Sequence, residues 1–352
     1  MKYITKKSAI FLLRERWQNI LGIVKRIKDN KTWYFWAKII QSCKNEDFRE
    51  YVRGFQGADI LMVKHLGNLY PDKLVYNIDI TEKLGFFGMV EFTLQYLMYA
   101  EKYHLTPYVN WSGCYAESLP VNGTKNVYEY YYNPVSEISN DDIRECRNVI
   151  FSYYKQRMVI CEKKEVTYRS RQESCFKYGE LYRKYFKLNQ RTKDYIDRNL
   201  RETLNGKKSL GVHIRGTDFK KGLHGHPVCI KAKDFIEPVQ KCMGGGRYEQ
   251  IFLATDSLEA IELFSRIFGN VLVFYNDVQR ADGDVGVHEI EISRKNHHYL
   301  LGMEVLRDVY TLAACDSLIA GLSNVSFAAQ YIKAANGSNY TEVVTLDRGL
   351  QK

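Results

Sequence analysis

Several short motifs that would assign an activity directly are absent from this sequence. It has no G-x-x-x-x-G-K-[ST] phosphate-binding loop, no G-x-G-x-x-G dinucleotide fingerprint, no H-E-x-x-H zinc motif and no G-x-S-x-G nucleophile turn. Each absence removes the usual sequence evidence for one class of protein: P-loop hydrolases, fingerprint-type nicotinamide enzymes, zincins and α/β-hydrolases. Any activity must therefore rest on another arrangement of residues.

Cysteine pairs at metal-binding or redox spacing are also missing. The eight cysteines are widely scattered, none forms a C-x-x-C pair, and none has the spacing of a zinc site. We therefore expect reduced, mostly structural thiols and a cytoplasmic protein.

Long apolar runs are missing near the N-terminus. The run Ala9–Leu13 ends before Arg14, which makes it too short for a signal-peptide core or a bilayer span. From Ile10 to Ile27, apolar residues instead recur at helical spacing with basic residues between them, which predicts a basic amphipathic helix. Two interpretations remain open: the helix packs on the protein itself, or residues 8–29 lie on an anionic membrane surface at its inner face.

Acidic residues are fewer than basic ones. The chain has 51 Lys and Arg against 41 Asp and Glu, a net charge of +10, which favours anionic partners such as nucleotide diphosphates, acidic glycans or membranes. The basic residues form no RNP-like or helix-turn-helix pattern, so no nucleic acid partner is expected. With 352 residues, 45% of them hydrophobic, the chain can build two compact domains.

The stretch Leu210–Asp218, L-G-V-H-I-R-G-T-D, is the most informative in the chain. Its apolar residues alternate as in a strand that ends at Gly216 and leads into a polar loop. Ligands of open α/β sheets bind where strands end, and the planar fork of Arg215 suits a diphosphate. A surface ion pair for Arg215 and a core position for His213 are the alternative interpretation. The crowding of His213, Arg215, Thr217 and Asp218 at one strand end favours a binding site.

Strands and helices alternate through the C-terminal half. We expect strands at Ser209–Arg215, Gln250–Thr255, Val271–Tyr275, Asp316–Ala320 and Glu342–Leu346, and helices at Ala232–Lys241, Leu258–Phe268, Tyr299–Ala314 and Val325–Ala335. This alternation predicts a doubly wound parallel sheet. The domains are then an N-terminal helical segment (1–70), an α/β domain (71–205) and a Rossmann-like domain (206–352).

Polar residues follow two further strands of this domain. Thr255 and Asp256 end the second strand, while Ser323 and Asn324 precede a helix whose N-terminus can face an anion. Helix capping alone would also explain Asp256 and Ser323. Their expected convergence with Arg215 at one sheet edge favours a shared site.

The first α/β domain begins with a βαβ unit: a strand at Leu74–Ile80, a G-F-F-G turn, a helix at about Met89–Tyr103 and a strand at Thr106–Trp111. Gly85 and Gly88 either permit close helix–strand packing or face a ligand. The tyrosine-rich segment Asn126–Pro134 has two interpretations as well, an aromatic core segment or a wall for an acceptor sugar.

The motif H-I-R-G-T-D resembles the H-x-R-x-T/G-D signature of the GDP-fucose-dependent fucosyltransferase superfamily, which includes core α-1,6-fucosyltransferases, nodulation fucosyltransferases and protein O-fucosyltransferases. Three more matches follow in the family's order: F-L-A-T-D (Phe252–Asp256), L-R-D-V-Y-T-L-A-A-C-D (Leu306–Asp316) and G-L-S-N (Gly321–Asn324). The resemblance covers about Ser209–Gln330 well. It implies an α/β, GT-B-like fold, two Rossmann-like domains facing across a cleft, with helices added at the N-terminus here.

The resemblance also implies roles for individual residues. His213 and Asp308 match positions that recognise the guanine nucleoside, and a carboxylate can accept from guanine N1 and N2 together. Arg215 matches the β-phosphate arginine, so it would stabilise the charge on departing GDP. Ser323 and Asn324 match the polar pair at the diphosphate, Thr255 and Asp256 a segment near the base and ribose, and Gly85 and Gly88 a glycine turn facing the donor.

The general base departs from the family pattern. Core α-1,6 enzymes have a lysine and a glutamate after the motif, where this chain has Phe219 and Leu223. The base would then be Asp218, His224 or His226, or a residue of the N-terminal domain, and Asp218 could instead orient Arg215.

The resemblance implies a cytoplasmic, metal-independent, inverting fucosyltransferase that uses GDP-fucose to modify a glycan, such as a bacterial-type surface polysaccharide or oligosaccharide. Asp282-Gly283-Asp284 is the one D-x-D in the sequence, and it reads as a turn rather than a metal site. We therefore expect no metal cofactor. Two alternatives stay open: a non-catalytic nucleotide- or sugar-binding protein of the same fold, and a transferase that uses another nucleotide sugar.

Overall fold

The computed structural model describes residues 63–64, 66–81, 83–102, 104–153, 175–216, 224–280 and 293–351. By their contacts they divide into two units: residues 1–82, 92–111 and 134–164 form the first, and residues 83–91, 112–133 and 165–352 the second. The predicted amphipathic helix at 8–29, Asp218 with Phe219 and Leu223, and the Asp282–Asp284 turn lie outside the described residues.

The first unit contains a four-stranded sheet in the order β1-β4-β2-β3. Its strands are β1 (Val63–Lys64), β2 (Val75–Ile80), β3 (Thr106–Trp111) and β4 (Val149–Tyr153). β2 pairs in parallel with β3 and β4, and β1 pairs antiparallel with β4. The predicted βαβ unit is confirmed, with helix α4 (Phe86–Lys102) between β2 and β3. The helix begins three residues before the predicted Met89, so Gly88 lies in its first turn rather than ahead of it.

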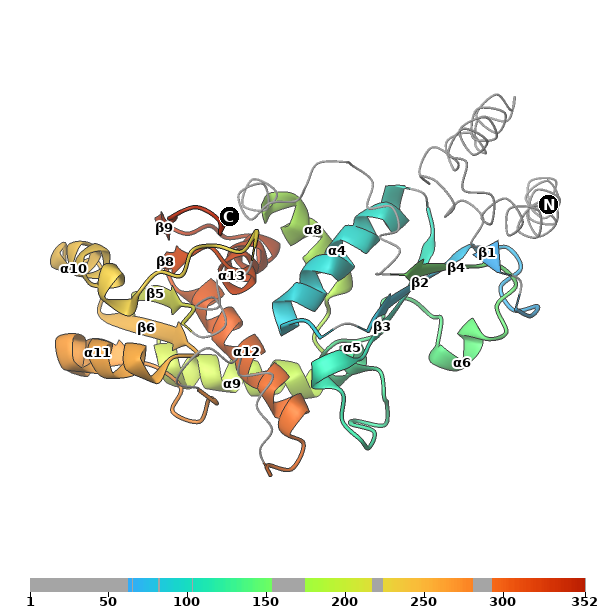
Figure 1. Cartoon of the computed structure of the whole chain (residues 1–352), viewed down its shortest axis with the longest axis horizontal. Coiled ribbons are helices and arrows are strands. Elements are labelled where there is room, and N and C mark those ends of the chain that lie inside the picture. Colours follow the sequence, from blue (N-terminus) through green and yellow to red (C-terminus); the bar gives the residue numbers. More distant parts are fainter. Residues whose placement is uncertain are drawn as a thin grey trace, which may run out of the picture. The chain divides into compact units, whose positions relative to one another are not determined.

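The second unit is built on a five-stranded parallel sheet in the order β7-β6-β5-β8-β9 (Figure 1). The strands are β5 (Ser209–Ile214), β6 (Gln250–Thr255), β7 (Leu272–Val273), β8 (Ser317–Gly321) and β9 (Val343–Leu346). Every residue of β5 and β6 is buried, as expected for strands covered on both faces. The chain runs outward from β5 to β7 and then returns to β8 on its other side. Such a change of direction is where doubly wound sheets bind ligands.

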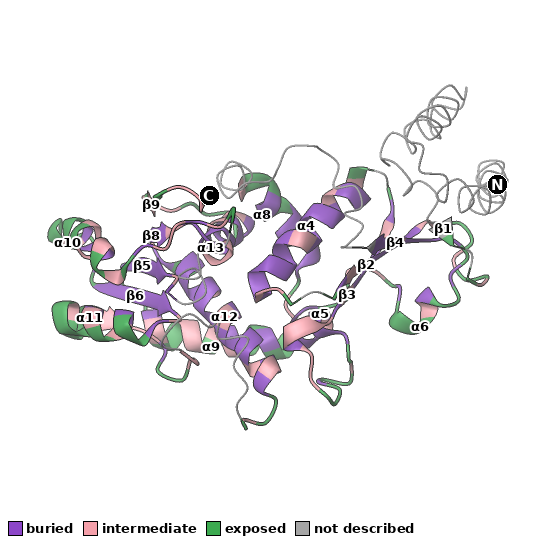
Figure 2. Ribbon diagram, viewed as in Figure 1, coloured by how far each residue is buried: buried purple, intermediate pink, exposed green. Residues whose placement is uncertain are grey.

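The predicted strands and helices of this unit are confirmed with small shifts at their ends. The helices are α10 (Ile236–Gly244), α11 (Leu258–Phe268), α12 (His297–Ala314) and α13 (Asn324–Ala335), with a 3₁₀ turn at Ala232–Phe235. Gly211 on β5 permits close packing, because a Cβ there would lie 3.2 Å from Leu312 and Cys315. The end of α12 can therefore lie directly on the central strand. In Figure 2 the strands are buried, whereas α10 and α11 have exposed outer faces.

Two helices that precede β5 also belong to the second unit, although residues 71–205 were expected to form one domain. In α9 (Gln190–Leu204), Thr192 lies 3.8 Å from the sulfur of Met303 on α12. In α8 (Cys175–Tyr185), Tyr182 packs against Tyr331 of α13. The predicted junction at Asn205-Gly206 is a turn with positive φ at both residues, and it leads from α9 into β5.

The tyrosine-rich segment forms a buried part of the core. It contains the short helix α5 (Val127–Tyr131), and Tyr128, Tyr130, Tyr131 and Tyr132 are each at most 1% exposed. The Tyr128 hydroxyl donates to the Tyr185 carbonyl at 2.9 Å, and both groups are buried. A side chain without exposed surface cannot contact a sugar, so the interpretation as an acceptor wall is wrong for these four tyrosines.

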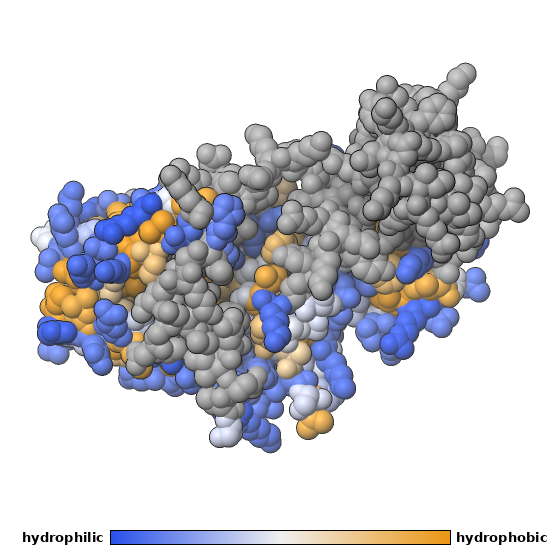
Figure 3. Space-filling view, in the orientation of Figure 1, coloured by the Kyte–Doolittle hydropathy of each residue, from blue (hydrophilic) through white to orange (hydrophobic). Residues whose placement is uncertain are grey.

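The described surface is mostly polar. Figure 3 shows apolar side chains in several places, including the left end of the view, where α11 lies in Figure 1. The exposed large apolar residues in and just after α11 are Leu258, Ile267 and Val271, at 41%, 40% and 37%. Among the described residues, no helix combines the length and apolarity needed to cross a bilayer.

Candidate active site

A pocket lies at the carboxyl ends of β5 and β6, within the second unit. Its volume is about 90 Å³, small beside the roughly 300–1,000 Å³ of whole ligand sites, so it could hold only part of a nucleotide sugar. It is lined by Tyr115, His213, Arg215, Ala254, Thr255, Asp256, Val278, Gln279, Leu301, Glu304, Val305, Asp308 and Val325. Five predicted donor-site residues, from β5, β6 and α12, therefore meet at one place.

Arg215 is held at the pocket by a carboxylate from the neighbouring strand. Its Nη1 lies 2.7 Å from Oδ2 of Asp256, and the two side chains are 24% and 10% exposed. The other oxygen of Asp256 accepts a hydrogen bond from the Gly216 backbone at 2.8 Å. Asp256 therefore fixes both the guanidinium and the backbone that follows it. The capping alternative for Asp256 is wrong, because Ser257 is the N-cap of α11.

His213 is buried and neutral at physiological pH. Burial lowers the pKa of its imidazole to about 4; Arg215 lowers it further, whereas Asp256 raises it. Nδ1 lies 3.3 Å from Oγ of Ser323, across the change of direction between β5 and β8. Ser323 is also the N-cap of α13 and forms a capping box with Ser326. The capping role considered for Ser323 is therefore confirmed, and the residue also fixes the position of the His213 ring. Its predicted role at the diphosphate stays a prediction.

Asp308 brings an acidic group to the pocket from α12. It is 9% exposed, and burial raises the pKa of its carboxyl group to about 7. Arg307 and Arg280 lower this pKa, whereas Glu304 and Asp277 raise it. Within the described part of the chain, no hydrogen bond joins the Asp308 carboxylate to another residue. A buried carboxylate that faces a pocket without such a bond is suited to accept hydrogen bonds from a ligand.

The predicted glycine turn lies beside this site. The backbone N–H of Phe86 donates to the hydroxyl of Tyr115 at 3.0 Å, and Tyr115 lines the pocket. A Cβ on Gly88 would lie 3.5 Å from Nδ2 of Asn324, whereas one on Gly85 would meet nothing within 4 Å. Gly88 is therefore close to the diphosphate pair predicted at Ser323 and Asn324.

Of the predicted general bases, the two that the structure describes, His224 and His226, do not line the pocket. Asp218 lies outside the described residues. The backbone carbonyl of His226 accepts from Gln351 at 2.7 Å, in a segment paired with the C-terminus. Catalysis by His226 or Asp218 stays a prediction.

Sequence reasoning missed Tyr115, Gln279 and Glu304 at the pocket. Tyr115 and Gln279 lie in segments without periodicity, so nothing in the sequence marked them. Glu304 stands four residues before Asp308 on α12, and this helical spacing was a signal that could have found it.

No cluster of three or more His, Cys, Asp or Glu side chains suited to a metal ion occurs in the described part of the chain. The expectation of a metal-free site stays a prediction.

No protein-family model and no curated protein sequence matches the chain. Solved structures that resemble it include NodZ α-1,6-fucosyltransferase co-crystallised with GDP, with 16% identity, a TM-score of 0.45, and coverage of 74% of this chain and 92% of that chain. The fucosyltransferase NodZ from Bradyrhizobium has 16% identity and a TM-score of 0.45, over 74% of this chain and 93% of that chain. POFUT1 in complex with GDP-fucose has 10% identity and a TM-score of 0.44, over 77% and 97%. This α/β chain is thus similar, at low sequence identity, to fucosyltransferases that bind GDP or GDP-fucose.

Proposed function

We propose that the protein is an inverting, metal-independent glycosyltransferase that transfers fucose from GDP-fucose to a hydroxyl group of a glycan. The observation that carries this proposal is the convergence of His213, Arg215, Thr255, Asp256 and Asp308 on one pocket at the ends of parallel strands. These five residues come from three of the four motifs that carry the resemblance to GDP-fucose-dependent enzymes.

The charges in the pocket suit a guanine nucleotide. Asp308 supplies a carboxylate that can accept from guanine N1–H and N2–H, and Arg215 supplies a cation for a phosphate. The N-terminus of α13, with Asn324 as its first residue, adds backbone N–H groups and the positive end of a helix dipole. Adenine and uracil do not offer two adjacent donors of this kind, so this arrangement favours guanine.

The reaction would proceed by displacement at the sugar. The acceptor oxygen forms a bond to fucose C1 as the bond from C1 to the β-phosphate oxygen breaks, and GDP leaves with that electron pair. The acceptor proton passes to a base, for which Asp218 and His226 are our candidates. Arg215 stabilises the negative charge that develops on GDP, a contribution that is often the largest in such catalysis. A bacterial-type surface polysaccharide or oligosaccharide, modified in the cytoplasm, is the acceptor we propose.

Nucleotide binding is the first test. Thermal shifts and calorimetry with GDP, UDP and CDP, each with and without EDTA, should show GDP as the strongest ligand and no effect of chelation. Restoration of binding or turnover by Mg²⁺ or Mn²⁺ after chelation would contradict metal independence. Equal affinity for the three nucleotides would contradict the guanine assignment.

Transfer is the second test. Incubation with GDP-fucose and a panel of glycans should release GDP and give a product with inverted anomeric configuration, read by NMR. Tight GDP binding without turnover on any acceptor or on water would favour the non-catalytic alternative. Turnover of another GDP-sugar instead of GDP-fucose would agree with the assignment of the guanine subsite but contradict the assignment of fucose as the sugar.

A further inference from the structure

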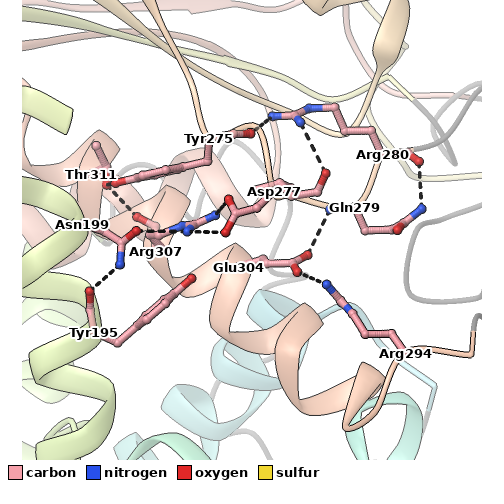
Figure 4. Close-up of polar contacts among 11 residues, drawn as sticks. Tyr195, Asn199, Tyr275, Asp277, Gln279, Arg280, Arg294, Glu304, Arg307 and Thr311 are labelled. Atoms are coloured by element: carbon pink, nitrogen blue, oxygen red, sulfur yellow. Dashed lines mark hydrogen bonds and ion pairs between the residues drawn. The ribbon is translucent and has the colours of Figure 1, made fainter. Parts of the chain in front are cut away.

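A buried arginine next to Asp308 in the sequence points away from the pocket. The side chain of Arg307 is 2% exposed, and its guanidinium lies against the ring of Tyr275, 3.8 Å from the centroid. It donates to both oxygens of Asp277 and to Oδ1 of Asn199, the latter at 3.1 Å. Figure 4 shows the guanidinium between these partners. Among the described residues, Nε has no hydrogen-bond partner, so the bonds of this guanidinium are those of Nη1 and Nη2 to Asp277 and Asn199.

Asp277 belongs to the segment 275–280, which forms one wall of the pocket. Val278 and Gln279 line the pocket, and Arg280 donates to the Tyr275 and Val278 carbonyls at 2.7 and 3.3 Å. These two bonds close the segment on itself. We therefore infer that a displacement of Asp277 would also displace the two lining residues.

Helix α12 joins this wall at three places along one face. The Thr311 hydroxyl lies 2.8 Å from the Tyr275 hydroxyl, Arg307 binds Asp277, and Glu304 accepts from the Gln279 backbone at 3.1 Å. Glu304 also binds Arg294, as Figure 4 shows. The Arg307–Asp277 pair is bidentate and charged, so of the three contacts it restrains the position of the wall relative to α12 most strongly.

We propose that Arg307 is a positioning residue that sets the base selectivity of the pocket, by fixing Val278 and Gln279 relative to Asp308 through its bidentate bond to Asp277. The inference rests on the function proposed above, because it takes the pocket to be the guanine subsite. Arg307 touches no ligand in this scheme. Arg307 can have this effect because α12 carries both Asp308, which faces the ligand, and Arg307, which holds the wall formed by segment 275–280.

The test compares the selectivity for GDP over UDP with the thermal stability of each variant. Asp277→Asn keeps the size of the side chain but weakens the bidentate pair, and Arg307→Lys keeps the charge but loses the planar fork. For both we expect the ratio of the UDP to the GDP dissociation constant to fall by about tenfold, the size of coupling between groups that share one network. The effect of Arg307→Lys on GDP affinity should largely disappear in an Asp308→Asn background, since both changes act on the same subsite.

Lys333→Met is the matched control. Lys333 is another buried cation, 7% exposed. It donates to the backbone carbonyls of Ala313 and Cys315, at the C-terminal end of α12. Its replacement should lower the melting temperature yet leave the GDP-to-UDP selectivity unchanged. Hydrogen exchange without ligand supplies a second measurement, and residues 275–280 should exchange faster in Asp277→Asn than in the parent.

The outcomes separate the two proposals. If the parent binds GDP selectively and both variants keep that selectivity while folded, Arg307 has only a structural role and the inference is wrong. The same holds if Lys333→Met reduces selectivity as much as Asp277→Asn does. If the parent shows no preference for GDP, the proposed function itself fails, and the inference fails with it. Should Arg307→Lys not fold, Asp277→Asn decides, because Asp277 is 69% exposed and its replacement disturbs the core less.

Discussion

Arg215 forms an ion pair with Asp256 and also lines the pocket, so the two roles considered for it, structural ion pair and phosphate ligand, do not exclude each other. The 2.7 Å contact with Asp256 was expected of a surface ion pair, yet Arg215 also lines the pocket. A guanidinium has five N–H donors, so a contact with a carboxylate is compatible with a second role at a phosphate. Asp256 therefore orients Arg215, and the orienting role that the sequence offered for Asp218 stays a prediction because Asp218 lies outside the described residues.

Replacement of Arg215 should reduce kcat more than GDP affinity. The added negative charge on GDP appears only as the sugar leaves, so the arginine contributes more in the transition state than in the ground state. We expect Arg215→Ala to lower kcat at least about 10²-fold, and Arg215→Lys to recover only part of it. The measurement is steady-state turnover of GDP-fucose paired with GDP titration. Near-normal kcat in a folded Arg215→Ala protein would leave the transferase proposal without its main catalytic group.

Asp308 should make GDP binding dependent on pH. The pKa of its carboxyl group is raised to about 7, so a fall from pH 8 to pH 6 protonates most of it and weakens its bonds to guanine donors. GDP affinity should then fall about tenfold at pH 6, since each pH unit below a pKa changes the ionised fraction about tenfold. In Asp308→Asn this loss should be smaller. The ionisable groups of GDP titrate in the same way with both proteins, so the difference between the two pH dependences of GDP affinity is due to Asp308.

The same carboxyl group should influence stability in the opposite direction. Its folded pKa lies above its ordinary value, so its contribution is fully present below pH 4 and is lost as pH rises through about 7. Asp308→Asn should therefore raise the melting temperature at pH 8 and have little effect near pH 4. A parallel loss of stability at both pH values would mean that the carboxyl group is needed for packing rather than for a ligand.

At the scale of elements, α12 contributes most to the candidate site. It carries both pocket residues and the joins to segment 275–280, and Glu304 belongs to both sets. The helix is also packed closely enough that a glycine is required. A Cβ on Gly302 would lie 2.1 Å from the Tyr131 hydroxyl, and that ring is 0% exposed. The position of α12, and with it that of Asp308, depends on this close contact.

Gly302→Ala should destabilise the protein although alanine is the better helix former. The fully buried Tyr131 ring has no free space to enter, and overpacking of this kind costs about 1–3 kcal/mol. Gly244→Ala in α10 is the control, because a Cβ there meets nothing within 4 Å, and it should be neutral or stabilise slightly. Chemical denaturation of both variants measures the effect. Equal stabilities would show that α12 can shift to accommodate the methyl group.

At the scale of the whole molecule, the two sheets have separate cores, and the division between them does not follow the chain. Residues 83–91 and 112–133 belong by contact to the second unit, although the first sheet lies on either side of them in sequence. Residues such as Tyr115 can therefore line a pocket at the end of β5 although they lie about a hundred positions earlier in the chain.

The N-terminal helix predicted at 8–29 should bind anionic membranes. Its basic residues are attracted to anionic headgroups, and its apolar face can enter the interface. Co-sedimentation of the full chain with vesicles that contain anionic lipid should exceed that of a protein without residues 1–30, and neutral vesicles serve as the control. Equal sedimentation of the two proteins would favour packing of the helix on the protein itself.

The sequence alone determined the elements of the second unit and the residues at their ends. Residue alternation in β5, and the alternation of strands with helices along the chain, placed His213, Arg215, Thr255 and Asp256 at strand ends, because these patterns are local or follow general rules of handedness. Asp308 was found through a motif on a helix. These residues meet in one pocket since parallel strands have their carboxyl ends at the same edge of the sheet.

The tertiary structure alone decided which groups contact one another across long separations in the chain. The pairing of Arg215 with Asp256, of Arg307 with Asp277, and of Tyr115 with Phe86 joins residues that no local pattern connects. It also decided that the tyrosine-rich segment is core, because aromatic density is compatible with a buried or an exposed face until the partners are known. Burial and pairing are properties of the packed chain, and they shift the pKa values of His213 and Asp308 on which the proposed chemistry depends.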